Sequence, residues 1–381
     1  MNSVYFDHNA TTQIDSRVLD AMLPWMRTQS GNPSSRHQFG RAAREAVAQA
    51  RAQVAAACGA QANQVVFTSS GTEANNLAIK GIAGYQAAGQ ILYSAVEHPC
   101  VSRSAVAMQA HGYQALSIPV DSQGKVDATQ LAALLKQPTS LVSVMLANNE
   151  TGVLQDVAGL ANLVRAQGRI MHTDAVQALG KIVLNFNELN VHAMTVSSHK
   201  IHGPQGAAAL ILDKRLDIQP LINGGGQERG LRSGTENVAA IVGFGLACEL
   251  ASQDLAHYQS HTLSLRTQLE AGLNAMNAVI FGSQAARLPN TSFFAIDGIE
   301  GETLVMALDR KGYAVASGSA CSSDSTEPSA VLLAMGVEED LARGAIRVSL
   351  GTQNTVQQVA AFLQHLQQEI NRLKQLSAMA A

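Results

Sequence analysis

Residues 193–200 read Ala193-Met194-Thr195-Val196-Ser197-Ser198-His199-Lys200, a short run with apolar residues at its start that leads to a lysine. A short run of this kind predicts a buried strand. Similar runs recur from about residue 15 to 250, and helical patterns separate many of them, as residues 157–167 separate 141–146 from 170–173. Strands joined through helices of this length predict a mainly parallel sheet with helices on both faces. The sequence therefore predicts an α/β fold for this part of the chain.

The chain has 381 residues, which is too long for one ordinary core and predicts about two domains. We expect a large domain over residues 15–250 and a smaller α+β domain formed by residues 1–14 and 251–381. Hydrophobic residues make up 46% of the chain and charged residues 14%, which is typical of a globular protein. The formal net charge of −3 creates no basic field, so we do not expect direct contact with nucleic acid.

The N-terminus lacks the basic and apolar regions of a signal peptide. The longest apolar stretch, residues 238–248, is too short to span a bilayer. Neither the cysteines nor the pair His199 and His202 show a metal-binding spacing. We therefore expect a cytoplasmic protein with no membrane contact and no metal site.

Three polar residues each follow a predicted strand: Asn149, Asp174 and Lys200. Ligands of parallel sheets bind beyond the carboxyl ends of the strands, so we expect these residues to share one site. A lysine amine can hold an aldehyde cofactor as a Schiff base, and a carboxylate can keep a pyridine nitrogen protonated. Lys200 and Asp174 together therefore match pyridoxal 5'-phosphate (PLP). Taken alone, Asp174 is better explained as a helix N-cap, and Lys200 could be a solvated surface lysine.

Residues 68–76 run from a strand end into a helix start. Gly71 allows a close backbone approach and Thr72 offers a hydroxyl, so this helix start could hold a phosphate. Taken alone, the segment is better explained as an ordinary helix cap. His98 follows another strand end, where an imidazole could stack on a planar cofactor or move a proton; a satisfied core histidine is an equally good interpretation.

Cys321 lies within residues 317–326, a run of small and polar residues that cannot build a core. We expect a mobile loop with an accessible thiol, which a lowered pKa would make reactive. The alternative is an inert buried cysteine, the usual state of a free thiol. Cys58, Cys100 and Cys248 lie in apolar or helical settings, and we expect them to be unreactive.

Stretches along essentially the whole chain resemble the cysteine desulfurases, a fold-type-I PLP family related to class V aminotransferases. The matching stretches are Asp7–Thr12, Gly31–His37, Ser70–Glu73, Glu97–Pro99, Asn148–Gly152, His172–Gln177, Ser198–Lys200, Gly226–Gly230 and Ser317–Cys321. The long segment around Cys321, about residues 317–328, resembles the group that serves iron–sulfur cluster assembly and nitrogenase maturation. The resemblance implies a large domain with a mainly parallel seven-stranded sheet and a smaller α+β domain that carries the Cys321 segment.

The resemblance also implies roles for individual residues. Lys200 would carry PLP, Asp174 would pair with its pyridine nitrogen, and His98 would stack on its ring. The other implied cofactor contacts are Gln177 and Asn149 near the phenolic oxygen, Gly71, Thr72, Ser197 and His199 at the phosphate, and Thr235 at the phosphate of a neighbouring subunit's cofactor. Arg347, assisted by Asn32, would bind the substrate carboxylate. The role of Thr235 implies a homodimer.

The implied reaction removes sulfur from L-cysteine and leaves L-alanine. Lys200 would take the α-proton, His98 would shuttle a proton, and Cys321 would attack the substrate sulfur and become a persulfide. The sulfur would pass to an acceptor such as an iron–sulfur scaffold, a tRNA-thiolation relay or a DNA-sulfur system, and L-selenocysteine is an alternative substrate. Two other interpretations stay open: a PLP aminotransferase or lyase, which needs no thiol, and a non-catalytic sulfur-assembly partner.

Overall fold

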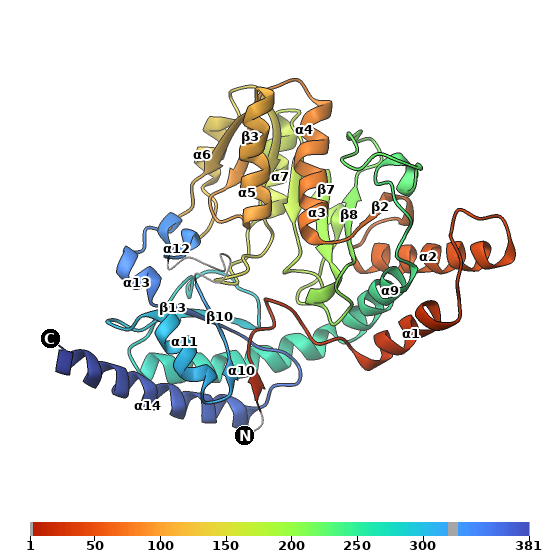
Figure 1. Cartoon of the computed structure of the whole chain (residues 1–381). Helices are drawn as coiled ribbons and strands as arrows, with labels where there is room; N and C mark the ends of the chain where they lie inside the picture. The colour runs from red at the N-terminus through yellow and green to blue at the C-terminus, as the bar shows by residue number, and fades with distance from the viewer. Residues whose placement is uncertain (1–2, 319–326, 381) are drawn as a thin grey trace.

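The structure is a computed structural model, and it describes residues 3–318 and 327–380 of the chain. Cys321 therefore lies outside the described residues. The central element is a seven-stranded sheet, seen in the upper part of Figure 1. Its strands, in spatial order, are β2 (Val65–Thr68), β8 (Ala208–Leu212), β7 (Ala193–Ser197), β6 (Met171–Asp174), β5 (Thr139–Ser143), β3 (Gln90–Ser94) and β4 (Gln114–Ile118).

The sheet is mainly parallel, as the sequence predicts. Pairs β7–β6, β6–β5, β5–β3 and β3–β4 are parallel, whereas β8 runs antiparallel to both of its neighbours. The carboxyl ends of β6 and β7 therefore meet at the same edge. Asp174 ends β6, and Lys200 follows β7 by one short turn.

Helices cover both faces of this sheet because both faces are apolar. Successive residues of each strand point to opposite faces, and both faces carry hydrophobic residues. Val66 and Leu210 belong to one core, whereas Val65 and Ile211 belong to the other. One face carries α3 (Gly71–Asn76), α4 (Ile82–Tyr85) and α5 (Pro99–Ala107). The other face carries α1 (Ser16–Arg27), α2 (Gln38–Ala57), α7 (Val157–Ala166) and α9 (Val238–Gln253). The short helices α6 (Ala128–Leu134) and α8 (Phe186–Leu189) complete this part.

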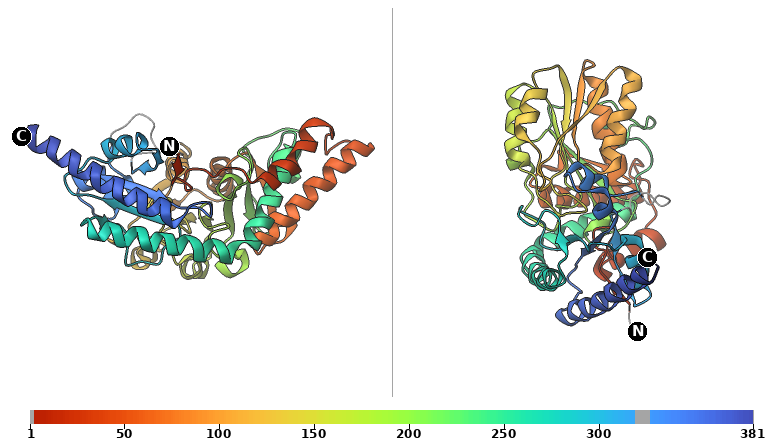
Figure 2. Two further views of the ribbon diagram at one scale, coloured as in Figure 1. Left: turned by 90° about the horizontal axis from the view of Figure 1, so that it is seen from below. Right: turned by 90° about the vertical axis from the view of Figure 1, so that its left-hand side faces the viewer.

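The C-terminal part is built around a four-stranded antiparallel sheet. Its strands are β12 (Ala316–Ser317), β13 (Ala345–Ser349), β10 (Thr291–Ala295) and β9 (Val279–Ile280). The helices around it are α10 (Leu255–Ala275), α11 (Gly301–Asp309), α12 (Ala330–Ala334), α13 (Glu339–Arg343) and α14 (Val356–Ala380). Helices α10 and α14 pack against each other along one side of the molecule (Figure 2).

The N-terminal residues join this C-terminal part. Strand β1 (Val4–Tyr5) pairs in parallel with β11 (Tyr313–Ala314), and Phe6 is fully buried in the core that α10 and α14 cover. The expected boundary of the two domains at residue 250 stays a prediction. Among the described helices, none is alone long and apolar enough to cross a membrane; α9 and α10 meet that test only together, as a pair bent by 69°.

Candidate active site

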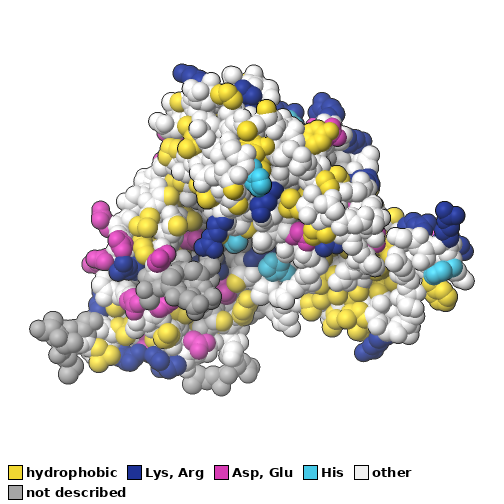
Figure 3. Space-filling view, turned by 45° about the horizontal axis from the view of Figure 1, so that its top comes forward, with side chains coloured by type: hydrophobic (Ala, Val, Ile, Leu, Met, Phe, Trp, Pro, Cys, Tyr) yellow, Lys and Arg dark blue, Asp and Glu magenta, His cyan; other side chains and the backbone are white. Residues whose placement is uncertain are grey.

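A cavity of about 480 Å³ opens at the carboxyl ends of the parallel strands, between the two sheets. It collects most of the side chains that the sequence singles out. The expected site residues that line it are Gly71, Thr72, His98, Asn149, Asp174, Gln177, Ser197, His199, Lys200 and Arg347. Figure 3 shows histidine and basic side chains near the middle of one face of the molecule. Residues from both ends of the chain therefore meet at one site.

Asp174 lies at the floor of this cavity with its side chain almost fully buried. Its Oδ2 accepts a hydrogen bond of 2.7 Å from Asn75 Nδ2, and its Oδ1 accepts one of 2.9 Å from the Val176 backbone N–H. Burial raises the pKa of Asp174, and these two donors oppose that rise. A buried carboxylate held in this way can bind a protonated ring nitrogen strongly, because little water screens the pair.

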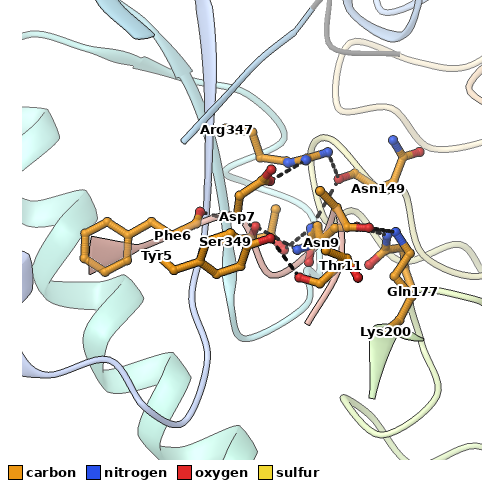
Figure 4. A network of polar contacts seen from close by, with 12 residues as sticks. Tyr5, Phe6, Asp7, Asn9, Thr11, Asn149, Gln177, Lys200, Arg347 and Ser349 are labelled. Atoms are coloured by element: carbon orange, nitrogen blue, oxygen red, sulfur yellow. Dashed lines mark hydrogen bonds and ion pairs between the residues drawn. The ribbon is translucent and has the colours of Figure 1, made fainter. Parts of the chain in front are cut away.

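Lys200 reaches the cavity from the short turn Ser198–Lys200 that follows β7. Its Nζ donates hydrogen bonds of 2.6 Å to the backbone carbonyls of Asn9 and Ala10 (Figure 4). The N-terminal segment thus orients the amine. Burial, followed by the charge of Lys200, lowers the pKa of the neighbouring His199 to about 4, so this imidazole is neutral near pH 7.

The part of the cavity beside α3 suits a phosphate group. Ser70 caps α3, and Gly71 and Thr72 form the first helical residues beside it. A Cβ at Gly71 would lie 3.1 Å from Val176 Cγ2, so a larger residue would crowd this part. Ser197 Oγ is buried and has no hydrogen-bond partner within the described part of the chain. A buried hydroxyl without a partner fits a bound oxygen acceptor.

Arg347 enters the cavity from β13 of the other sheet and is 7% exposed. Its Nη2 lies 2.7 Å from Asp7 Oδ1, and its Nη1 donates a 3.0 Å hydrogen bond to the Asn149 carbonyl (Figure 4). Its Nε has no partner among residues 3–318 and 327–380. The guanidinium therefore retains an unused donor beside the site, as expected for a group that binds a small carboxylate.

The structure does not bring every expected residue to this cavity. Thr235 and Asn32 are exposed and do not line it. The Asn32 side chain instead accepts a 2.9 Å hydrogen bond from the Ser34 backbone N–H. The role expected of Thr235 concerns the cofactor of a second subunit in a predicted homodimer. The roles of Thr235 and Asn32 stay predictions, as does that of Cys321, which lies outside the described residues.

The sequence analysis missed several supporting residues, one of which is the buried Lys181. Its Nζ donates to Gln177 Oε1 at 2.6 Å and to Asn9 Oδ1 at 2.8 Å. Because an ammonium or amine donates here, the Gln177 oxygen must face Lys181 and its Nε2 must face the cavity side, where it also donates to the Asn9 carbonyl. Gln177 and Lys181 lie four residues apart in the turn that follows β6, and no pattern in the sequence pairs them.

The fold and this constellation define a member of a known enzyme class. The family model for class V aminotransferases matches residues 4–362. The chain is 41% identical to cysteine desulfurase 2 of Trichormus variabilis over 380 residues, covering 99% of this chain and 95% of the relative.

Solved structures agree with that comparison. A NifS-like protein superposes with a TM-score of 0.91 at 38% identity, covering 97% of this chain and 99% of the other. SspA, solved in complex with cysteine, superposes with a TM-score of 0.82 at 31% identity, covering 92% and 99% of the two chains. The chain therefore belongs to the cysteine desulfurases within the class V aminotransferase family, and the predicted fold class is confirmed.

Proposed function

We propose that the cavity binds PLP through Lys200 and uses it to remove sulfur from L-cysteine, leaving L-alanine and a persulfide on Cys321. One observation carries this proposal. Lys200 and Asp174 line the same cavity, as do Arg347 and the Ser197 hydroxyl, which has no hydrogen-bond partner in the described part of the chain. Each group of the cofactor and the substrate carboxylate then has a chemically matched neighbour.

Different residues of the cavity would contact different parts of the cofactor. Asp174 would bind the pyridine N–H, and His98 would lie against the ring. Gln177 and Asn149 would contact the phenolic oxygen, while Gly71, Thr72, Ser197 and His199 would hold the phosphate. When bound, PLP supplies an electron-withdrawing ring that weakens first the Cα–H bond and then the C–S bond of the substrate.

Lys200 would have a second task, as a base. Its neutral Nζ would accept the α-proton, and the carbonyls of Asn9 and Ala10 would keep that nitrogen aimed at the site. Arg347 would bind the substrate carboxylate, with Asn32 as an assisting group. The ion pair between Arg347 and Asp7 fixes the plane of the guanidinium group, so substrate binding costs little side-chain entropy.

Cys321 would accept the sulfur. The described residues that lead toward it support this role, because Ala316 pairs with Arg347 across β12 and β13. The segment that leads to Cys321 therefore begins beside Arg347, the group that would bind the substrate carboxylate. The Cys321 thiolate would form a bond to the substrate sulfur while the C–S bond breaks. The persulfide sulfur would then pass to an acceptor protein such as an iron–sulfur scaffold, from a homodimer in which Thr235 contacts the partner's cofactor.

The test compares three full-length variants, Cys321→Ser, Lys200→Ala and, as a matched control, Cys248→Ala. Alanine released from L-cysteine and borohydride-trapped cofactor are measured separately. We expect Cys321→Ser to retain the trapped cofactor and lose alanine release, Lys200→Ala to lose both, and Cys248→Ala to retain both. Full alanine release by Cys321→Ser, or activity only with an amino donor and pyruvate, would contradict the proposal.

A further inference from the structure

A chain of polar contacts links Asp174 to His98 through two residues that the proposed reaction does not use. Asn75 Nδ2 donates to Asp174 Oδ2 at 2.7 Å and to Cys100 Sγ at 3.1 Å. Cys100 Sγ lies 2.9 Å from His98 Nδ1. All four residues line the cavity. Cys100, which the sequence left among the unreactive cysteines, therefore stands between the two groups expected to contact the cofactor ring.

The direction of these hydrogen bonds follows from the donors available. Asn75 Nδ2 has two hydrogens and uses them on the carboxylate and on the sulfur; the reverse amide orientation would set an oxygen against the carboxylate of Asp174. The sulfur accepts from Asn75, and the hydroxyl of Thr72, its other hydrogen-bonding neighbour, can donate to it as well. The S–H is then available to donate to His98 Nδ1. The backbone N–H of Cys100 also donates to this Nδ1, at 3.2 Å, because His98 caps the start of α5.

Two donors thus converge on Nδ1 of His98, and an imidazole nitrogen that accepts hydrogen bonds carries no proton of its own. We propose that Cys100 is a positioning residue that keeps His98 neutral with its proton on Nε2. The inference rests on the proposed function, in which His98 lies against the cofactor ring. In this state His98 can donate a proton from Nε2 but cannot accept one there. Proton acceptance from the substrate then falls to Lys200.

The charges around His98 are consistent with this assignment. Burial lowers the pKa of His98, Asp174 opposes that effect, and Lys200 and Arg103 add to it. Burial also raises the pKa of the Cys100 thiol to about 12, so the S–H stays protonated near neutral pH; Thr72 and Glu97 are its other polar neighbours. A thiolate beside Asp174 would be repelled, whereas a neutral thiol is not.

The test measures the tautomer and the pKa of His98 in the full-length protein, with and without PLP. Histidine is labelled with ¹⁵N, two-bond proton–nitrogen spectra identify the protonated nitrogen, and His98→Gln assigns the signal. We expect the Nε2–H tautomer in the wild type and in Cys100→Ser, which keeps a donor. Cys100→Ala removes one donor to the neutral form, so the pKa of His98 should rise by about 0.7, the equivalent of one net hydrogen bond.

Cys248→Ala removes a fully buried thiol elsewhere and should leave the His98 signal unchanged. An Nδ1–H tautomer in the wild type overturns the inference, as does an unchanged pKa in Cys100→Ala. The backbone N–H of residue 100 can set the tautomer without the thiol, so the role of the thiol is tested by the pKa of His98. If Cys100→Ala folds poorly, Cys100→Val, which also lacks a side-chain donor, gives the same comparison. Alanine release from L-cysteine by the wild type tests the proposed function independently of the His98 spectrum.

Discussion

Acidification should destabilise this protein in part through the buried histidine His172. This residue lies in β6, two positions before Asp174, and its side chain is fully buried. Its ring nitrogens contact Ser143 Oγ at 2.8 Å and Thr195 Oγ1 at 3.1 Å, hydroxyls on the two neighbouring strands. Burial lowers the pKa of His172 from 6.5 to about 3, because a charged imidazole in the middle of the sheet would lose its water.

The sign and size of the effect follow from proton linkage. Between pH 6.5 and 3 the unfolded chain binds a proton at this position and the folded chain does not, so stability falls as the pH falls through this range. Above pH 6.5 neither state binds the proton, and the contribution is constant. From pH 7.5 to 5.0, integration of this difference gives a loss of about 2 kcal/mol from His172 alone.

The assay compares the wild type with His172→Gln, which cannot titrate but can still bond to both hydroxyls. Urea unfolding is followed by circular dichroism at pH 7.5 and 5.0, at one protein concentration and with excess PLP. The wild type should lose about 2 kcal/mol more than the variant over this interval. All other titrating groups are common to both proteins and cancel in the difference. Equal losses would refute the reasoning, and His257→Gln, at an exposed position, should behave like the wild type.

Three further substitutions test the site and the core. Arg347→Lys replaces a two-pronged donor by a point charge, so the KM for L-cysteine should rise about tenfold or more with the cofactor spectrum retained; an unchanged KM would argue against carboxylate binding there. Asp174→Asn should lower kcat about a hundredfold or more while KM changes little, in steady-state assays of alanine release. Glu228→Gln breaks a buried ion pair with Arg51 at 2.5 Å and should cost about 3 kcal/mol in urea unfolding, with a loss below 1 kcal/mol contradicting this.

The positions of Asp174, Lys200 and the segment around Gly71 in the site could be predicted from the sequence, because they depend on local strand and helix patterns. Asp174 and Lys200 each come at or just after the end of a short predicted strand, and parallel strands place their carboxyl ends at one edge. The segment around Gly71 was recognisable in the same way, as a strand end that turns into a helix start. These features need only the chain's own periodicity and the geometry of a parallel sheet.

Other parts of the site depend on residues far apart in the sequence. Asp7 meets Arg347 and Asn9 meets Lys181 only because the N-terminal segment crosses between the two sheets. The antiparallel direction of β8 left no pattern that distinguishes it from its neighbours, since a buried strand is apolar in either direction.

The sequence by itself determined the α/β class, the lysine–aspartate pair and the resemblance that leads to the cysteine desulfurases. Only the tertiary structure decided which atoms face each other: Cys100 against His98, Lys181 behind Gln177, and Arg347 beside the cavity. The physical reason is that hydrophobic periodicity fixes which face of an element is buried. The partner of a particular buried polar atom is fixed by the packing of several elements at once.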